Sequence, residues 1–322
     1  MTTSRPSIFL DSLVHRVLGD RSDLLTGIED ESNLISSVPI VGARSLELAD
    51  EDEIVFCKSE TPESVAALLS SSSRFAVVRP KMLELVNEAY RSEHALVITP
   101  RPRLVLALLM SVFQAVQHTD QTEMVHPDAQ VAASVTLSPG VVVGPDVEIG
   151  PRCIIGANTV VEHAIVGSDC RIGPNCTIGG EGFSFEIDRA GVPVYFPHFG
   201  RVIIGDNVEI CSNCGISRGS LRDTVLEDHV KLDNLVQVAR NCRIGRATFL
   251  TANAMLAGSV TVGEQVWIGP STAVINGAEI GSHAMTALGA VVTSSVDDNA
   301  VVAGVPAKKL RDRYSPDDPA LG

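Results

Sequence analysis

A repeat of six residues dominates the second half of the chain. Every sixth residue from Leu226 to Val292 is aliphatic in eleven of twelve cases, without a change of register. The residue four places after each of these is small or β-branched. A period of six matches neither a helix of 3.6 residues per turn nor the alternation of an ordinary strand. It predicts a parallel β-helix, in which each hexapeptide supplies a short strand and a corner.

The same repeat reaches back toward the middle of the chain. It keeps its step of six from Val125 to Val161, and it shifts by one residue before Val166. Two segments interrupt it, residues 180–200 and 217–225. The β-helix is therefore expected to occupy roughly residues 124–300, with the longer interruption as a loop insertion.

The first 120 residues show no hexapeptide pattern. Brief β-branched runs alternate with segments of helical spacing, and Thr61 followed by Pro62 is a typical helix start. This alternation predicts a small α/β domain. The expected strands are Glu53–Cys57, Phe75–Val78 and Ala95–Ile98, and the expected helices lie at Ile8–Leu18, after Thr61, at Lys81–Arg91 and at Pro102–His118. The predicted domains are residues 1–120, a β-helix domain at 121–305 that includes the insertion 180–200, and a tail at 306–322, with a polar joint at 117–123.

Composition excludes several classes of function. Hydrophobic residues make up 45% of the chain and aromatic residues only 4%, which suits a narrow core of Val, Ile and Ala. The formal net charge of −14 argues against nucleic acid as a partner. The longest apolar run, Leu104–Val116, is too short to span a bilayer, and the N-terminus shows no secretory signal. We therefore expect a cytoplasmic protein without a membrane span.

The seven cysteines have a structural explanation. Five of them occupy the fifth position of a hexapeptide, where a small inward side chain is needed, and buried Cys behaves as a small hydrophobe. Cys211 and Cys214 form a C-x-x-C pair, but no second pair lies at zinc-finger spacing. We expect core packing and no metal site, with metal or redox chemistry as the alternative. The five are Cys153, Cys170, Cys176, Cys214 and Cys242.

Three hexapeptides form one triangular coil, so residues 18 apart stack on one another. This places Arg240, Gly258 and Asn276 in one column, beside a second column of Asn241, Ser259 and Gly277. Since Ala257, Gly258 and Ser259 have little bulk, a groove is expected there in which an extended acyl donor meets the backbone. His229 and His283 fall on another corner, and His126 and His163 lie in early coils and receive no role.

The insertion at 180–200 contains five of the thirteen aromatic residues, among them Phe183 and Phe185. An aromatic loop that leaves a regular scaffold often carries specificity. Contact with a ligand or a neighbouring subunit and plain packing against the scaffold both remain open.

Three segments together resemble the UDP-3-O-acylglucosamine N-acyltransferases of lipid A synthesis. They are Gly179-Gly180-Glu181-Gly182-Phe183, Pro197-His198-Phe199-Gly200-Arg201-Val202-Ile203-Ile204-Gly205-Asp206 and Asp233-Asn234-Leu235-Val236-Gln237-Val238-Ala239. The resemblance covers nearly the whole chain. It implies a left-handed β-helix, a homotrimer with sites between subunits, and an N-terminal nucleotide-binding domain. The family reaction moves an acyl group from a thioester to a sugar amine.

The departures from this family concern the site. Arg240 stands where the family has its catalytic histidine, and a further histidine expected near Asn276 is absent. The C-terminal helix that helps to hold acyl carrier protein has little room after Leu310. Residues 289–308 instead look like the ending of acetyltransferases that use coenzyme A.

The resemblance and the columns together give the candidate site. Arg240 stays protonated and cannot act as a base, so it is expected to bind an anion or to stabilise the oxyanion. His198 is the first candidate for the base, with a structural role as its alternative. Phe183, Phe185, Asp233, Asn234, Gln237 and Asn241 are expected to bind the acceptor, and Ala257, Gly258, Ser259, Asn276 and Gly277 the acyl donor.

Three functions compete. The main hypothesis is an N-acyltransferase that uses acyl-coenzyme A to modify a nucleotide-linked amino sugar, with no bound cofactor. The second is the UDP-3-O-acylglucosamine N-acyltransferase itself, with acyl carrier protein as donor. The third is an inactive trimer that binds ligand without catalysis.

Overall fold

The computed structural model describes residues 7–19, 24–117 and 124–313, and these form two compact units. The first unit contains the described residues up to 117 together with Ser184–Phe199 and Ser220–Arg222. The second contains the described residues 124–183, 200–219 and 223–313. The predicted joint at 117–123 lies outside the described residues except for Gln117.

A five-stranded sheet forms the centre of the first unit, in the order β2-β7-β6-β5-β4. Strands β4 to β7 are parallel and β2 is antiparallel to β7. Phe75–Val78 and Ala95–Ile98 are entirely buried, as expected for short apolar strands in the middle of a sheet. The strands are β2 (Gly27–Glu29), β4 (Gly42–Ala43), β5 (Glu53–Phe56), β6 (Phe75–Val78) and β7 (Ala95–Ile98), and a separate pair is β1 (Ile8–Phe9) with β3 (Pro39–Ile40).

The helices of this unit follow the sequence signals except that Ile8 and Phe9 form a strand, the short helix Leu34–Ser37 was not predicted, and the helix expected at Lys81–Arg91 is broken. Thr61 caps α3 by accepting a hydrogen bond from the Ser64 N–H at 3.3 Å. The single helix predicted at Lys81–Arg91 is wrong, because Val86 is extended and Asn87 starts a new helix by accepting from the Tyr90 N–H at 2.8 Å. The helices are α1 (Leu10–Leu18), α2 (Leu34–Ser37), α3 (Pro62–Ser70), α4 (Met82–Leu85), α5 (Glu88–Glu93) and α6 (Pro102–Gln117).

The middle of the long insertion packs with the first unit. Its strands β17 (Phe185–Ile187) and β18 (Pro193–Tyr195) form an antiparallel hairpin. Phe196, 2% exposed, joins the core around α1 and α6, and the guanidinium of Arg103 lies 4.7 Å from the centre of its ring. Part of this loop therefore packs in the core of the first unit and not against the β-helix scaffold, as the packing alternative had assumed.

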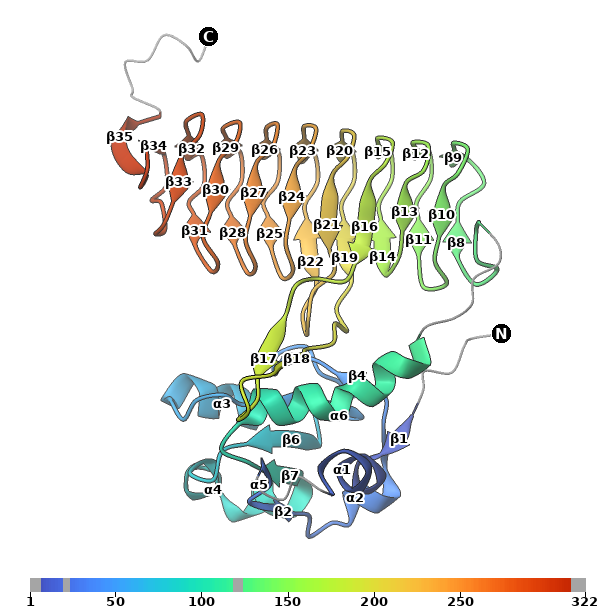
Figure 1. Cartoon of the computed structure of the whole chain (residues 1–322), viewed down its shortest axis with the longest axis vertical. Coiled ribbons are helices and arrows are strands. Elements are labelled where there is room, and N and C mark those ends of the chain that lie inside the picture. Colours follow the sequence, from blue (N-terminus) through green and yellow to red (C-terminus); the bar gives the residue numbers. More distant parts are fainter. Residues whose placement is uncertain (1–6, 20–23, 118–123, 314–322) are drawn as a thin grey trace. The chain divides into compact units, whose positions relative to one another are not determined.

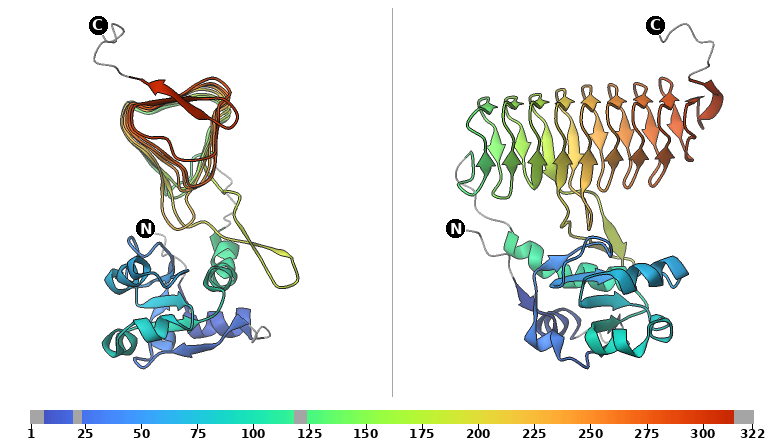
Figure 2. Two further views of the ribbon diagram at one scale, coloured as in Figure 1. Left: turned by 90° about the vertical axis from the view of Figure 1, so that its left-hand side faces the viewer. Right: turned by 180° about the vertical axis from the view of Figure 1, so that it is seen from behind.

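The second unit is a left-handed parallel β-helix, as predicted. Its coils are triangular in cross-section, and one short strand of each coil contributes to each of three long sheets (Figures 1 and 2). Strand pairs such as Arg243 with Thr261 and Thr261 with Glu279 confirm that residues 18 apart stack. We name the sheets X, Y and Z, and the chain visits them in the order Y, Z, X.

The strands of the β-helix are mostly two residues long. Sheet X contains β10 (Val142–Val143), β13 (Val160–Val161), β16 (Thr177–Gly180), β21 (Gly215–Ser217), β24 (Gln237–Val238), β27 (Met255–Leu256), β30 (Ala273–Val274) and β33 (Val291–Val292). Sheet Y contains β8 (Gln130–Val131), β11 (Glu148–Ile149), β14 (Ala164–Val166), β19 (Val202–Ile204), β22 (Thr224–Leu226), β25 (Arg243–Ile244), β28 (Thr261–Val262) and β31 (Glu279–Ile280). Sheet Z contains β9 (Thr136–Leu137), β12 (Ile154–Ile155), β15 (Arg171–Ile172), β20 (Glu209–Ile210), β23 (Lys231–Leu232), β26 (Phe249–Leu250), β29 (Trp267–Ile268), β32 (Met285–Thr286), β34 (Ala300–Ala303) and β35 (Lys308–Asp312).

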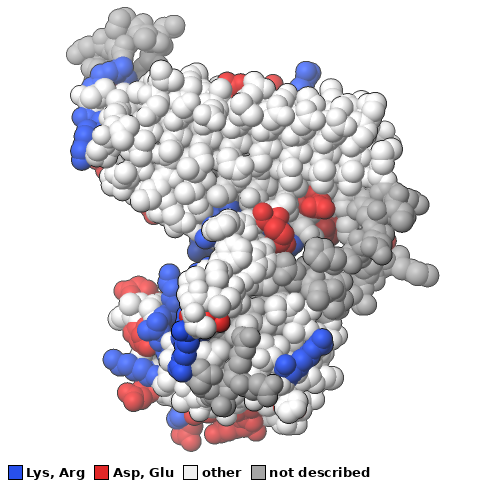
Figure 3. Space-filling model, in the orientation of Figure 1, with Lys and Arg blue, Asp and Glu red and all other residues white. Residues whose placement is uncertain are grey.

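The aliphatic residue of each hexapeptide points inward and fills the coil. Val238, Ile244 and Leu250, one from each sheet of a single coil, are at most 1% exposed. The last strand, β35, turns back antiparallel on β34, so part of the predicted tail forms the end of sheet Z. The face of the second unit seen in Figure 3 carries few charged side chains.

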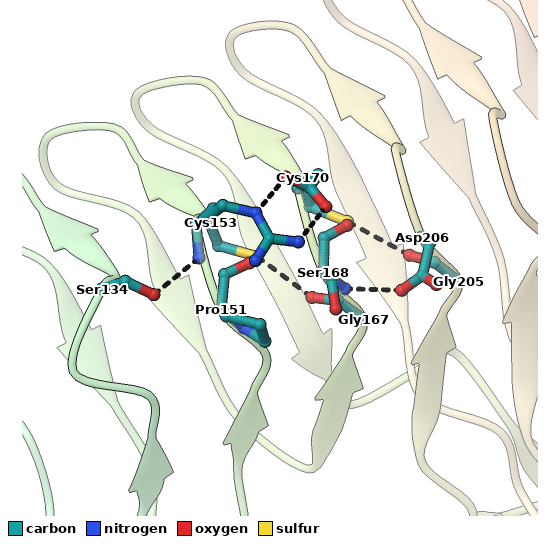
Figure 4. Close-up of polar contacts among 10 residues, drawn as sticks. Ser134, Pro151, Cys153, Gly167, Ser168, Cys170, Gly205 and Asp206 are labelled. Atoms are coloured by element: carbon teal, nitrogen blue, oxygen red, sulfur yellow. Dashed lines mark hydrogen bonds and ion pairs between the residues drawn. The ribbon is translucent and has the colours of Figure 1, made fainter.

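The five cysteines at the fifth position of a hexapeptide are buried, as predicted. Each thiol donates a hydrogen bond to a carbonyl oxygen of the next coil. The Sγ of Cys153 lies 3.0 Å from the Gly167 oxygen, and that of Cys170 lies 3.1 Å from the Gly205 oxygen (Figure 4). In the C-x-x-C pair Cys211 is exposed and Cys214 is buried, so the two side chains face opposite sides of the coil wall.

Candidate functional site

The corner between sheets X and Y contains the two columns of residues that the sequence predicted. Arg240, Gly258 and Asn276 follow strands β24, β27 and β30 at the same point of successive coils. Their backbones are joined by hydrogen bonds from the Ser259 N–H to the Arg240 oxygen at 2.9 Å and from the Gly277 N–H to the Gly258 oxygen at 3.0 Å. The predicted column therefore exists, and we call this edge of the β-helix the X–Y corner.

The space beside Gly258 is filled by its neighbours. A Cβ on Gly258 would lie 2.7 Å from Nη1 of Arg240 and 2.9 Å from the side-chain amide of Asn276. When its nitrogen points at the Gly258 oxygen, the Asn276 amide donates to that oxygen at 2.9 Å and accepts from the Gly277 N–H at 3.3 Å. The groove expected at Ala257–Ser259 is thus occupied at Gly258 by two polar side chains.

The neighbouring column is more open toward its C-terminal end. Asn241 has φ +62° and its N–H donates to Oγ1 of Thr224 at 2.9 Å. Its side-chain nitrogen lies 3.5 Å from Oγ of Ser259, while nothing lies within 4 Å of a Cβ built on Gly277. An extended ligand on this corner would meet the Gly277 backbone and the guanidinium of Arg240 rather than the backbone of Gly258.

Three predicted acceptor residues lie away from this column. Asp233 and Asn234 stand on the corner between sheets Z and X, where Oδ1 of Asp233 accepts from the Asn234 N–H at 2.7 Å and Oδ2 accepts from the Ala252 N–H at 3.2 Å. Gln237 lies on β24 between the two corners, with its side chain against Gly215. Strand β24 therefore separates Asp233 and Asn234 from Arg240.

The residues predicted from the insertion divide between the two units. Phe183 belongs to the second unit and is 86% exposed. Phe185 belongs to the first unit, where its ring meets that of Tyr195 edge-on at 5.4 Å. His198 is also in the first unit, only 1% exposed, and its Nδ1 lies 2.9 Å from the Tyr195 hydroxyl oxygen. Such burial favours the structural alternative for His198.

The X–Y corner also holds a pair that sequence reasoning missed. His163 follows β13 and Asp146 follows β10, one coil apart, and Nδ1 of His163 lies 2.7 Å from Oδ2 of Asp146. Burial opposes ionisation of Asp146, but His163, Arg218 and Arg201 outweigh it and lower the pKa of this carboxyl to about 2. The carboxylate is therefore anionic at neutral pH.

Two arginines that form ion pairs lie around His163 and Asp146. Arg201, at the start of the next coil, donates to the Asp146 carbonyl oxygen, and one of its nitrogens lies 3.5 Å from Oε1 of Glu148. Its own N–H donates to Oδ1 of Asp223 at 2.7 Å. Arg218, 3% exposed, donates from Nε to the Gly200 oxygen at 2.7 Å. Residues at the ends of both interruptions of the repeat therefore lie together at this corner, Arg201 with Asp223 and Arg218 with Gly200.

The signal for His163 was the shift of register by one residue. The coil that contains it is one residue short, so His163 takes the left-handed corner position, at φ +45°, five residues after Asn158 instead of six. Gly179, at φ +84°, allows the next coil to approach, because a Cβ there would overlap the Glu162 carbonyl oxygen. Counting strands of sheet X rather than residues would have placed His163 on the corner of Arg240.

Among the described residues, no cluster of three or more His, Cys, Asp or Glu side chains is arranged to hold a metal ion. Within the same ranges, none of the helices has the length and hydrophobicity that crossing a membrane requires.

Comparison with known proteins gives partial matches. Residues 128–163 match a family described as "Bacterial transferase hexapeptide (six repeats)". The chain is 35% identical over 156 residues, 48% of this chain and 44% of the relative, to a UDP-3-O-acylglucosamine N-acyltransferase of Methylorubrum extorquens. It is 39% identical over 132 residues, 41% of this chain and 43% of the relative, to the probable UDP-3-O-acylglucosamine N-acyltransferase 2, mitochondrial, of Arabidopsis thaliana.

A crystal structure of a UDP-N-acetylglucosamine acyltransferase superposes with a TM-score of 0.53 at 24% identity, covering 59% of this chain and 71% of that one. This likeness supports the fold. The chain spans less than half the length of the curated relatives it matches, so the resemblance is narrower than the sequence motifs suggested. The resemblance to UDP-3-O-acylglucosamine N-acyltransferases is confirmed over these segments, on a left-handed β-helix of hexapeptide repeats.

Proposed function

We propose that the protein is an N-acyltransferase that moves an acyl group from a thioester to the amine of a nucleotide-linked amino sugar. The observation that carries the proposal is the 35–39% identity to relatives named UDP-3-O-acylglucosamine N-acyltransferase. Those names favour a UDP-linked 3-O-acylglucosamine as acceptor, which was the second hypothesis, over an unspecified amino sugar. As part of the same proposal, the protein works as a cytoplasmic homotrimer without a bound cofactor.

The X–Y corner supports this chemistry in part. Acyl transfer to an amine requires a group that binds the anionic portions of the substrates and a group that accepts the proton of the attacking amine. Arg240 meets the first requirement, because a guanidinium remains charged and matches phosphate and carboxylate oxygens. Asn276 and Gly277 lie within two coils of it and present an amide and an open backbone. We assign Arg240 to an anionic group of the donor or acceptor.

The donor is proposed to be a thioester of acyl carrier protein, with acyl-coenzyme A as the alternative. Both donors carry a phosphorylated pantetheine arm, so Arg240 can serve either one. The corner from Ala257 to Gly277 remains the proposed place of this arm, with Gly258 covered and Gly277 open.

The test is release of free thiol, followed with a chromogenic disulfide. The purified full chain is mixed with acyl-carrier-protein or acyl-coenzyme A thioesters of several chain lengths, and with UDP-3-O-acylglucosamine, UDP-glucosamine or a dTDP-amino sugar. Release that requires both donor and acceptor supports the proposal, and mass spectrometry identifies the amide product. Binding of a nucleotide sugar without thiol release from any pair would instead support the inactive homologue.

A further inference from the structure

Arg240 cannot accept a proton, so the proposed reaction needs its base elsewhere. His198 is 1% exposed, and His229 and His283 stand on the corner between sheets Y and Z. His163 differs from them in lying on the X–Y corner with 27% of its side chain exposed. Its partner Asp146 lies in the preceding coil, so the two side chains meet because the coils stack on one another.

The contact between these side chains fixes the chemistry of the imidazole. An N–H on Nδ1 that donates to Oδ2 of Asp146, 2.7 Å away, leaves the lone pair of a neutral ring on Nε2. The carboxylate also stabilises the imidazolium that forms when Nε2 takes up a proton. Because the carboxyl of Asp146 has a pKa of about 2, it keeps its charge throughout the range in which a histidine titrates.

The charges around the pair are largely compensated. Arg201 contacts the Asp146 carbonyl and Glu148, and Arg218 forms an ion pair with Glu181 at 3.6 Å. Arg201 also donates its backbone N–H to Asp223. The Asp146 carboxylate is thus bonded directly to His163, and the two arginines that act on this carboxylate have carboxylate partners of their own.

We propose that His163, oriented by Asp146, is the general base of the acyl transfer, an assignment that rests on the proposed function. The amine nitrogen attacks the thioester carbonyl carbon, a C–N bond forms, and Nε2 of His163 accepts the proton that the amine loses. The tetrahedral intermediate then expels the thiolate, the C–S bond breaks, and the imidazolium returns the proton to sulfur. The products are an amide and a free thiol, and no other reactant is required.

This assignment separates the reacting centre from Arg240. His163 and Arg240 are three coil-to-coil steps apart along sheet X, which corresponds to about 14 Å at about 4.8 Å per step. The two side chains therefore act on different parts of an extended ligand. The base faces the amine, and the guanidinium holds an anionic group several bonds away.

The test replaces His163 by Asn, which accepts the left-handed backbone at φ +45° but cannot take up a proton. His229→Asn and His283→Asn are matched controls, because these residues have φ +61° and +60° on a different corner. In the thiol-release assay we expect His163→Asn to lower kcat by roughly 10²–10⁴ with little change in KM, and the controls to stay within about threefold.

Asp146→Asn gives a second readout that a purely structural role would not change. Loss of the anionic partner removes the carboxylate that stabilises the imidazolium. The acid limb of the kcat/KM profile should then move about one unit to lower pH, and its plateau should fall. An acid limb unchanged in position would overturn the assignment, even if His163→Asn failed to fold.

The outcomes separate the two proposals. An active wild-type protein whose His163→Asn variant keeps its kcat within about threefold overturns the base and leaves the acyltransferase proposal standing. A wild-type protein that releases no thiol with any donor and acceptor overturns both.

Discussion

The guanidinium of Arg240 lies over Gly258, so that the hydrogen of this glycine occupies a place that admits no methyl group unless the arginine moves. The atoms that would clash, Nη1 of Arg240 and Oδ1 of Asn276, belong to side chains and not to the backbone. The relationship between these two residues can therefore be changed without disturbing the coil.

We expect Gly258→Ala to displace Arg240 and to destabilise the protein by roughly 1–2 kcal/mol. In Arg240→Ala only the Asn276 amide still crowds this position, so the same glycine substitution should cost less, with a coupling of about 1 kcal/mol in a double-mutant cycle. Urea unfolding of the four proteins measures it. Additive effects would show that Arg240 does not cover Gly258 in solution.

Gly179→Ala should be far more damaging. A Cβ there would overlap the Glu162 carbonyl oxygen, which belongs to the backbone, and φ is +84°. We expect a loss of at least about 3 kcal/mol, or failure to fold. The control is Gly289→Ala, with φ +66° and nothing within 4 Å, which should cost only the roughly 1–2 kcal/mol of the left-handed conformation. Equal losses of stability in Gly179→Ala and Gly289→Ala would show that the Glu162 carbonyl oxygen does not crowd Gly179.

The pairing of Asp146 makes stability depend on acid pH. Its folded pKa of about 2 lies below the ordinary value of 3.8, so the pair stabilises the fold above about pH 4. This contribution is lost as the pH falls from about 4 to about 2. Since 46% of the side chain is exposed, solvent screening limits the contribution to about 1 kcal/mol.

Urea unfolding of Asp146→Asn and of the wild-type protein across pH 2–7 checks this point. The stability difference between them should be largest at neutral pH and vanish near pH 2. A difference independent of pH would mean that the carboxylate is not selectively stabilised in the folded state.

Threonine should replace Cys153 better than valine does. The hydroxyl of Thr159, at the same position of the next hexapeptide, donates to the Gly173 oxygen at 2.7 Å, as the Cys153 thiol does to the Gly167 oxygen. Cys153→Thr can keep this bond, whereas Cys153→Val leaves the carbonyl without it. We expect Thr to be the more stable by about 1 kcal/mol, measured by thermal unfolding. A more stable Val variant would show that the inward hydrogen bonds contribute little.

The period of six was enough to predict the β-helix and the stacking of Arg240, Gly258 and Asn276, because a repeated core position leaves the chain few alternatives. It was not enough to predict where their side chains point. Arg240 and Asn276 fold over Gly258 through rotamers that no periodicity encodes. The helix break at Val86 and Asn87 was missed for a similar reason, since the apolar spacing continues through it while the asparagine cap stops it.

His163 received no role from the sequence because it lies in an early coil, and the 18-residue count from Arg240 does not reach it across the interruptions. A coil shortened by one residue and two coils extended by loops break the 18-residue rule, yet sheet X runs without interruption past all three. His163 and Asp146 lie 17 residues apart, the spacing of the shortened coil, in which Glu148 pairs with Ile165.

Because sheet X is uninterrupted, distances along the X–Y corner are whole multiples of the spacing between coils. Each added turn of the solenoid lengthens this corner by one fixed increment, whereas loops can grow outward from a turn without altering that increment. The span between His163 and Arg240 is therefore set by a whole number of turns, and a ligand that must reach both is selected for its length before any of its functional groups is recognised.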